Sequence, residues 1–204
     1  MAQQENRYNV SRETFEKLDA YVELVLKWNP RINLVSKSSA EQIHDRHIAD
    51  SLQLAEGFTE EVETWVDLGS GGGFPGLVLA ILAAERPLAR RFVLVESDAR
   101  KSAFLAQVSR VLALPVTIKT ERIEKLEPQN ADVLSARALA SLTELCGFAD
   151  RHLKKDGMAL FPKGASFQQE IDEARKLWSF DVTPRASVTN PNSAILSLWN
   201  IKHV

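Results

Sequence analysis

The stretch Asp67-Leu68-Gly69-Ser70-Gly71-Gly72-Gly73-Phe74-Pro75-Gly76 joins a short β-rich run to a helical run. Glycine allows a tight turn and a close approach of the backbone to a ligand, and proline fits the first turn of a following helix. The stretch therefore predicts a strand, a glycine-rich turn and a helix, with a small flat ligand at the turn. A tight turn without a ligand is the plain alternative, which so many glycines disfavour.

Outward from this stretch, β-rich runs alternate with helical runs through most of the chain. The expected strands are Thr64–Leu68, Phe92–Glu96, Val116–Thr120, Val133–Ala136 and Met158–Pro162. The expected helices between them are Pro75–Ala84, Ala99–Leu112 and Leu139–Leu153. A last helix, Gln168–Trp178, precedes a terminal antiparallel hairpin of Asp181–Val188 and Ala194–Ile201. Such alternation is typical of βαβ units and predicts an α/β fold with a mostly parallel sheet.

The residues before the first expected strand have a helical pattern. Apolar residues recur there at three- and four-residue spacing: Phe15, Leu18, Val22, Val25 and Leu26. This helix should end at Trp28-Asn29, because Pro30 lacks the donor that would continue it. A second helix should run from Ser39, which has capping-box spacing to Gln42, toward Leu54.

Length and composition exclude several classes of protein. The 204 residues predict a helical N-terminal extension (1–60) packed on one domain (61–204), in a single compact unit. The longest apolar run, Leu77–Ala84, is much shorter than the roughly 20 residues of a membrane-spanning helix. Cys146 is the only cysteine, so neither an intrachain disulfide nor a cysteine-based zinc site is expected. We expect a cytoplasmic monomer without membrane contact.

Two classes of cofactor match the glycine-rich stretch. Residues 71–76 fit the dinucleotide pattern G-x-G-x-x-G, and Glu96 follows about 20 residues later, as in nicotinamide-dependent oxidoreductases. Counted from the strand, the same stretch reads Asp67-x-Gly69-x-Gly71-x-Gly73. An acid directly before the turn would repel a pyrophosphate and attract the ammonium group of an amino-acid moiety. Asp67 therefore favours S-adenosylmethionine, and a nicotinamide-dependent oxidoreductase stays the alternative.

Residues after the second and third strands complete the expected cofactor site. Glu96 closes the second strand, where a carboxylate accepts hydrogen bonds from the ribose hydroxyls of either cofactor. Ile123 and Glu124 follow the third strand, where they could flank an adenine ring.

Several separated stretches resemble one known family. They are Asp67–Gly76, Leu94–Ser97, Arg100–Leu105, Ser135–Leu142, Pro162–Gly164, Trp28–Ser36 and Arg46–Leu52. Together they resemble the glucose-inhibited division protein B family of bacterial 16S ribosomal RNA guanine-N7 methyltransferases, also called ribosomal RNA small subunit methyltransferase G. The resemblance covers nearly the whole chain, from Phe15 to Trp199.

The resemblance implies a class I methyltransferase fold, Rossmann-like, with a seven-stranded, mostly parallel sheet. It implies S-adenosylmethionine as methyl donor and a guanine in the 530 loop of 16S ribosomal RNA as acceptor, in the 30S particle or an assembly intermediate. It places cofactor contacts at Gly69, Phe74, Ile123, Glu124 and Arg137. Asp67 and Glu96 take the methionine and ribose positions of this fold, and Gly71 and Gly73 of the turn complete the expected cofactor-binding set.

Guanine N7 already carries an in-plane lone pair, so its methylation requires no general base. A direct in-line displacement suffices, and the task of the protein is to align the reactants. A donor that bonds guanine O6 would orient the base. Arg137 and Lys163 follow the fourth and fifth strands, at the carboxyl ends where α/β sheets bind ligands. We expect both to orient the guanine. The alternative for Arg137 is a structural ion pair, and the alternative for Lys163 is a solvated turn.

RNA contacts are expected at charged and polar residues in three parts of the chain. They are Arg46, His47, Asp50 and Ser51, the pair Arg90 and Arg91, and Lys163. The net charge of −2 argues against nonspecific coating of nucleic acid, although a local basic patch can still hold a phosphate backbone. His44, His47 and Asp50 recur every three residues, but helical metal pairs favour four-residue spacing, so we expect no metal. A noncatalytic RNA-binding module that retains the cofactor pocket is the remaining alternative to an enzyme.

Overall fold

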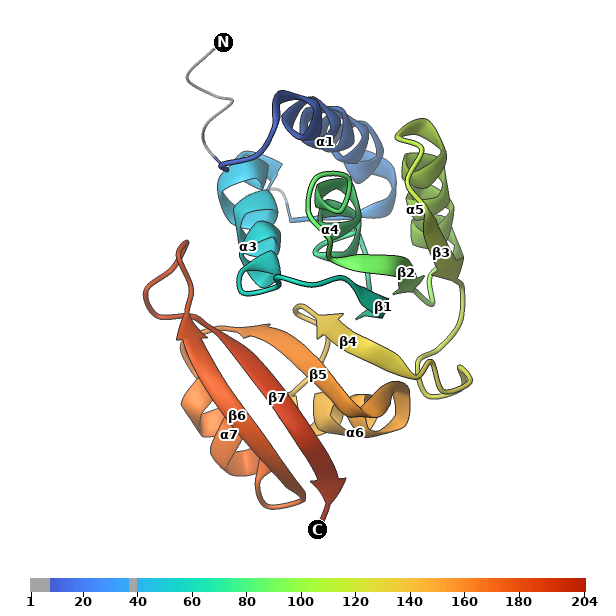
Figure 1. Cartoon of the computed structure of the whole chain (residues 1–204). Coiled ribbons are helices and arrows are strands. Elements are labelled where there is room, and N and C mark those ends of the chain that lie inside the picture. The colour runs from blue at the N-terminus through green and yellow to red at the C-terminus, as the bar shows by residue number, and fades with distance from the viewer. Residues whose placement is uncertain (1–7, 37–39) are drawn as a thin grey trace.

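The computed structural model of the chain describes residues 8–36 and 40–204. Within them, one sheet has the strand order β3-β2-β1-β4-β5-β7-β6 (Figure 1). Its strands are β1 Val62–Leu68, β2 Ala89–Val95, β3 Val116–Lys119, β4 Ala131–Ala136, β5 Leu153–Lys163, β6 Trp178–Ala186 and β7 Ala194–His203. The first five strands pair in parallel, and β7 pairs antiparallel with β5 and β6. The expected α/β fold with a seven-stranded, mostly parallel sheet is confirmed.

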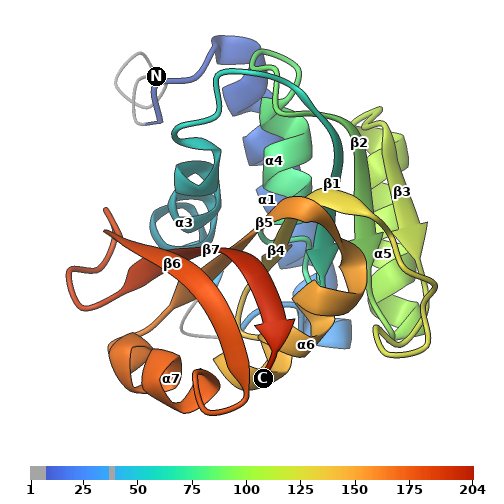
Figure 2. The same cartoon turned by 60° about the horizontal axis from the view of Figure 1, so that its bottom comes forward.

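Helices cover both faces of the sheet, because its central strands are apolar on both sides. Trp65 of β1 is buried in the core on one face, and the next residue, Val66, is buried in the core on the other. The helices are α1 Arg12–Ile32, α4 Gly76–Leu82 and α5 Ala99–Val111 on the Trp65 side, and α6 Leu142–His152 and α7 Phe167–Ala174 on the Val66 side (Figure 1, Figure 2). None of the helices in the described part of the chain has both the length and the apolar character needed to cross a bilayer.

The first helix, α1, continues beyond Trp28-Asn29, so its predicted end was wrong. It ends at Ile32 and contains Pro30 in its last turn. A proline there removes one backbone donor without preventing the next two residues from staying helical. The helix closes at Asn33, which adopts the left-handed conformation and donates its N–H to the carbonyl of Asn29.

The expected second helix consists of three short segments. A π-helical segment, η1, spans His44–Ile48, α3 spans Ala49–Leu52, and a 3₁₀ segment, η2, spans Gln53–Ala55. Ser39, the predicted cap, lies outside the described residues. Because the hydrogen-bond spacing changes twice, side chains of this stretch do not follow one helical period, and the single helix predicted from the sequence was wrong.

Some element ends differ from the expected ones by a few residues. Helix α6 begins at Leu142 because Ser141 and Glu144 form a reciprocal capping box. Helix α7 ends at Ala174, and Trp178 begins β6 instead of ending a helix. The predicted terminal antiparallel hairpin is confirmed as β6 and β7.

The strand order reverses at β1, which lies between β2 and β4. At such a reversal the connections leave in opposite directions, and ligands bind at the carboxyl ends of the strands. Residues 69–75 follow β1 at this edge, and Arg137 follows β4 directly. The fold thus brings the glycine-rich turn and Arg137 to one edge of the sheet.

Candidate active site

The glycine-rich turn after β1 is built from backbone conformations that glycine adopts most readily. Gly69, Gly71 and Gly73 have φ angles of +62°, +55° and +93°. A Cβ on Gly73 would lie 2.4 Å from Cδ1 of Leu77, which is too close for any side chain. The turn therefore depends on glycine for both its conformation and its packing on α4.

The carboxylate of Asp67 ties the two ends of this turn together. Its Oδ1 accepts a hydrogen bond from Oγ of Ser135 at 2.8 Å, and its Oδ2 accepts one from the N–H of Gly76 at 3.3 Å. Asp67 is only 1% exposed, and this burial raises the pKa of its carboxyl to about 6. The hydrogen bonds from Ser135 and Gly76 oppose that rise, and above a pH of about 6 the carboxylate form predominates.

The residues expected to contact ribose and adenine follow the next two strands. Glu96, directly after β2, accepts hydrogen bonds from the N–H groups of Gly71 at 2.9 Å and Asp98 at 2.8 Å. Ile123, after β3, is buried, and its carbonyl lies 3.0 Å from Nε2 of His152. Glu124 is exposed. Asp67 near the end of β1, Glu96 after β2 and Ile123 after β3 thus lie along three neighbouring strands at the same edge of the sheet.

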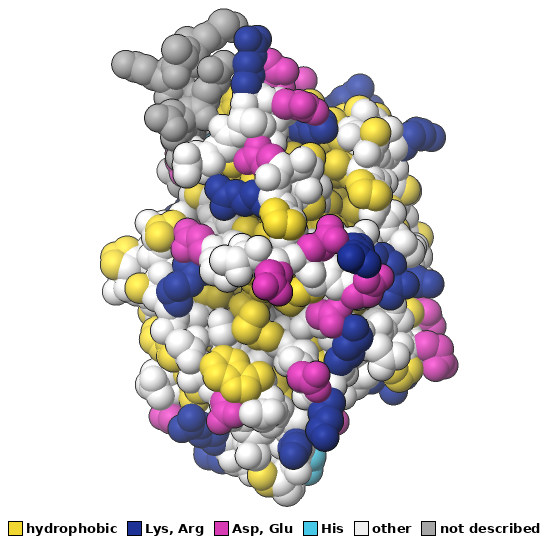
Figure 3. Space-filling view, viewed as in Figure 1, with side chains coloured by type: hydrophobic (Ala, Val, Ile, Leu, Met, Phe, Trp, Pro, Cys, Tyr) yellow, Lys and Arg dark blue, Asp and Glu magenta, His cyan; other side chains and the backbone are white. Residues whose placement is uncertain are grey.

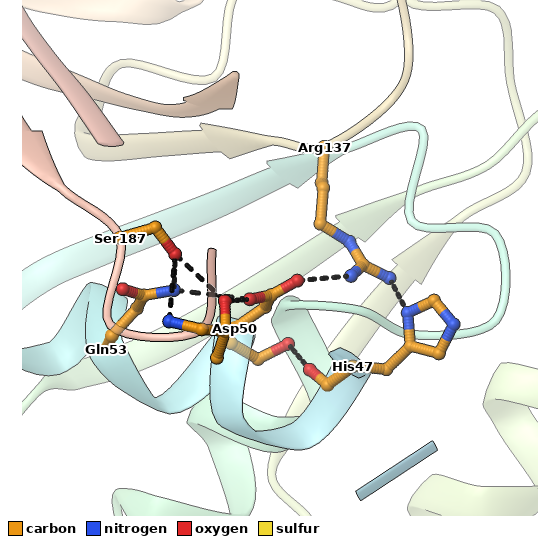
Figure 4. Close-up of polar contacts among 7 residues, drawn as sticks. His47, Asp50, Gln53, Arg137 and Ser187 are labelled. Atoms are coloured by element: carbon orange, nitrogen blue, oxygen red, sulfur yellow. Dashed lines mark hydrogen bonds and ion pairs between the residues drawn. The ribbon is translucent and has the colours of Figure 1, made fainter. Parts of the chain in front are cut away.

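Phe74 links the turn to Arg137 and His47. Its ring centroid lies 5.4 Å from the guanidinium carbon of Arg137 and 4.9 Å from the imidazole of His47. Arg137 also contacts Nδ1 of His47 at 2.5 Å and Oδ2 of Asp50 at 3.6 Å (Figure 4). Side chains from β1–α4, η1, α3 and the end of β4 therefore meet in one cluster.

His47 is neutral in this cluster. Burial, followed by the charge of Arg137, lowers the pKa of His47 to about 4. A guanidinium group is always a donor, so Nδ1 of His47 accepts and the proton lies on Nε2. That Nε2 is buried and has no hydrogen-bond partner in the described residues. The cluster therefore holds one buried donor that a ligand could satisfy.

A pocket of about 700 Å³ opens beside the cluster. Five predicted site residues line it: Arg46, His47, Asp50, Arg137 and Lys163. Its other walls come from the end of β5 and the turn after it, from Glu170 of α7, and from the β6–β7 connection with the start of β7; that connection reaches toward α3 (Figure 2). A pocket of this size at the carboxyl edge of the sheet can hold a base or a nucleotide.

Three of the predicted RNA-contact residues lie away from this pocket. Ser51 is fully buried and donates its hydroxyl to the carbonyl of His47 at 2.6 Å. Arg90 and Arg91 are at the amino end of β2, at the opposite edge of the sheet from the pocket. There Arg90 pairs with Glu61 at 2.9 Å, and Arg91 donates to Oγ1 of Thr64 at 3.1 Å. On the face seen in Figure 3, basic side chains stand beside acidic ones.

Sequence reasoning missed two side chains that shape the pocket, Gln53 and Glu170. Gln53 is 3% exposed and bonds Ser187 and the backbone of Val188 in the β6–β7 turn. Glu170 bonds Lys163. The partners of Gln53 lie more than 130 residues away, so no local spacing in the sequence indicates those contacts. Lys163 and Glu170 are seven residues apart, and their contact depends on how α7 docks beside the end of β5.

Within residues 8–36 and 40–204, no group of three histidine, cysteine or acidic side chains has an arrangement that could bind a metal ion. Cys146 is buried, and burial raises the pKa of its thiol to about 12.

Known proteins match this chain along nearly its whole length. The family model described as "GidB: rRNA small subunit methyltransferase G" matches residues 14–196. Ribosomal RNA small subunit methyltransferase G of Ruegeria pomeroyi is 52% identical over 199 residues, covering 98% of this chain and 97% of that protein. The protein of the same name from Cereibacter sphaeroides strain ATCC 17025 is 53% identical over 196 residues, covering 96% and 94%.

Solved structures with low sequence identity share the fold. A SAM dependent methyltransferase from Aquifex aeolicus has a TM-score of 0.58 and 12% identity, over 80% of this chain and 97% of that one. M. jannaschii TYW2 in complex with AdoMet has a TM-score of 0.55 and 14% identity, over 86% and 80%. At such identities the likeness concerns the fold alone.

Proposed function

Because the chain belongs to the GidB family of ribosomal RNA small subunit methyltransferase G, and is an S-adenosylmethionine-dependent methyltransferase, we propose that it methylates N7 of a guanine in the 530 loop of 16S ribosomal RNA. The observation that carries the proposal is the pocket of about 700 Å³ lined by His47, Asp50 and Arg137, two of which contact Phe74 of the glycine-rich turn. Family membership also excludes the nicotinamide-dependent oxidoreductase and the noncatalytic module that the sequence left open.

The residues at the turn fit S-adenosylmethionine. Glu96 offers carboxylate oxygens for ribose hydroxyls, and Asp67 supplies negative charge near an amino-acid moiety. His47 supplies a buried donor, Nε2–H, without a partner in the described residues. When bound, S-adenosylmethionine supplies a methyl group on a positively charged sulfur. Gly69, Gly71, Gly73, Phe74, Ile123, Glu124 and Arg137 complete the proposed cofactor-binding set.

The protein needs no general base for this reaction, because guanine N7 carries no proton. The two carboxylates in the pocket wall, Asp50 and Glu170, are paired with Arg137 and Lys163. We propose that the pocket acts by alignment, which is worth roughly 7–11 kcal/mol of barrier in favourable cases. In direct in-line displacement the bond from N7 to the methyl group would form as the sulfur–methyl bond breaks and the neutral thioether leaves, so the protein has only to hold the two reactants in line.

Arg137 and Lys163 are the proposed orienting groups for the guanine. Arg137 is 17% exposed and is held by Asp50, His47 and Phe74. Lys163 is 10% exposed and lines the same pocket. Lys163→Ala should slow methyl transfer while leaving S-adenosylmethionine affinity unchanged, and unchanged turnover would remove Lys163 from the site.

Small-subunit ribosomal RNA is the proposed partner, in the 30S particle or an assembly intermediate. Arg46, His47 and Asp50 lie at the pocket, where an RNA strand that delivers a guanine would pass. The test is to incubate purified protein and labelled S-adenosylmethionine with 30S subunits that lack the modification, and to analyse the nucleosides by mass spectrometry. We expect label in 7-methylguanosine; label in another nucleoside, or none, would contradict the proposal.

A further inference from the structure

Lys163 and Glu170 form a fixed ion pair in the wall of the pocket. Nζ of Lys163 donates to Oε2 of Glu170 at 2.7 Å and to the carbonyl of Ala140 at 2.9 Å. The same Oε2 accepts the N–H of Leu142 at 3.0 Å. Both side chains are only partly exposed, and both line the pocket. The pair is therefore held by β5, α6 and α7 together and faces the space proposed for the base.

Each partner keeps unused hydrogen-bonding capacity: one donor on Lys163, and on Glu170 one carboxylate oxygen whose two lone pairs can accept two hydrogen bonds. An ammonium group has three donors, and Lys163 uses two of them in the described structure. A carboxylate has two acceptor oxygens, and Oε1 of Glu170 receives no hydrogen bond from any described residue. A spare donor and a spare acceptor thus stand side by side in the pocket wall.

This arrangement is complementary to guanine. Guanine presents the acceptor O6 next to the donors N1–H and N2–H, whereas adenine presents a donor amino group at the position of O6 and an acceptor at N1. Proteins that bind a flipped-out base read it by hydrogen bonds to this edge. Adenine would place a donor against the ammonium group and a lone pair against the carboxylate.

We propose that Glu170 is a specificity-determining residue, which accepts N1–H and N2–H of the acceptor guanine while Lys163 donates to O6. This inference rests on the function proposed above. Contacts along O6, N1 and N2 leave N7 free, because N7 lies on the other side of O6. The ion pair therefore selects guanine without blocking the atom that is to be methylated.

The test compares guanine with inosine at the target position of reconstituted 30S subunits, since inosine lacks only the N2 amino group. For the wild-type protein we expect kcat/KM about tenfold lower on inosine, the effect of losing one hydrogen bond to a charged group. Glu170→Ala should lower kcat/KM on guanine and methylate the two acceptors equally, and Glu170→Gln should lie between. Lys163→Ala should slow both acceptors and keep the ratio, because inosine retains O6.

The matched control is Glu173→Ala, on the same helix, where an exposed carboxylate pairs with Lys176 at 2.7 Å. It should keep both the activity and the ratio. A wild-type ratio near one, or a ratio that persists in both Glu170 variants, would overturn the inference while leaving N7 methylation of guanine intact. Absence of 7-methylguanosine with the wild-type protein would instead contradict the proposed function.

Discussion

The carboxylate of Asp67 is buried at the end of β1, beside the turn proposed to hold the cofactor. Because burial raises the pKa of this carboxyl to about 6, Asp67 changes its charge in a pH range in which cofactor binding can be measured. Arg137, which favours the ionised form, keeps its charge over this range, and the pKa of His47, about 4, lies below it. A pH titration between 5 and 7.5 therefore spans the change of charge of Asp67, and Asp67→Asn separates it from other titrating groups.

We predict that S-adenosylmethionine binds more weakly as the pH falls below about 6, because protonation removes the negative charge that attracts its ammonium group. The dissociation constant should rise by up to about tenfold per pH unit below that pKa. In Asp67→Asn the affinity should be lower and independent of pH over the same range. Calorimetric titration measures this, and a wild-type affinity constant from pH 5 to 7.5 would contradict it.

Gly73 has a positive φ and no room for a side chain, whereas Gly57 has a positive φ of +88° and open space around it. Gly57→Ala should therefore lower the free energy of unfolding by about 1–2 kcal/mol, for the backbone alone. Gly73→Ala also places its Cβ too close to Leu77, so the free energy of unfolding should fall by about 2–4 kcal/mol. Urea denaturation measures the free energy of unfolding of both variants. Equal losses in the two variants would contradict a steric conflict between residue 73 and Leu77.

At the scale of elements, hydrogen bonds and an ion pair connect the turn between β6 and β7 to the segment that directly follows α3. Nε2 of Gln53 donates to Oγ of Ser187 at 3.2 Å, and its Oε1 accepts the N–H of Val188 at 3.1 Å. Arg185 bonds the carbonyl of Gln53 at 2.6 Å and pairs with Glu56. These contacts, of which Figure 4 shows the one between Gln53 and Ser187, hold one wall of the pocket in place.

Gln53→Ala should loosen this wall. We expect the free energy of unfolding to fall by about 1–3 kcal/mol, because the hydrogen bonds of a buried side chain are lost. The amide of Val188 should exchange its hydrogen faster, and KM for RNA should rise. Gln42→Ala, at an exposed position, is the control and should change stability by less than about 0.5 kcal/mol. An unchanged exchange rate at Val188 would show that Gln53 does not hold the turn.

The elements themselves could largely be predicted from the sequence, because strands and helices differ in the spacing of their apolar residues and are separated by glycine, proline and polar turn residues. The end of α1 could not, since Pro30 stands where a helix tolerates the loss of one donor. The π-helical turn at His44–Ile48 could not either, because its hydrogen bonding depends on packing against neighbouring elements.

At the scale of the molecule, the sheet has two edges with different charge environments. The pocket edge carries Arg46, which is exposed, whereas Arg90 at the opposite edge already pairs with Glu61 at 2.9 Å and Glu63 at 3.5 Å. Carboxylates that neutralise an arginine lower its attraction for phosphate. RNA that contacts Arg90 and Arg91 as well as the pocket would have to extend from one edge to the other.

We predict that Arg46→Ala lowers the salt dependence of RNA binding by about one unit of log K per log salt, because one phosphate contact is lost. Charge reversal of both Arg90 and Arg91 tests their expected RNA contact. We expect its effect on that slope to be smaller than the effect of Arg46→Ala, and an unaltered slope would remove the two arginines from the RNA-binding surface. Binding titrations at several salt concentrations provide the measurement.

The site as a whole could be predicted only in part. Asp67 lies near the end of a strand, and Glu96 and Arg137 directly follow strands, so the rule for the carboxyl ends of a sheet brings them to one edge. The contact between His47 and Arg137, 90 residues apart, and the pair of Lys163 and Glu170 depend on how helices dock on that sheet. These contacts depend on the whole fold, and local sequence patterns do not predict them.

The most direct test of the central claim is to map N7-methylguanine in 16S ribosomal RNA from cells with and without this protein. We predict that one guanine of the 530 loop is methylated at N7 only when the protein is present, and is methylated again when the gene is restored. Identical methylation of that loop in both kinds of cell, or a methyl group that disappears from a different base or position, would contradict it.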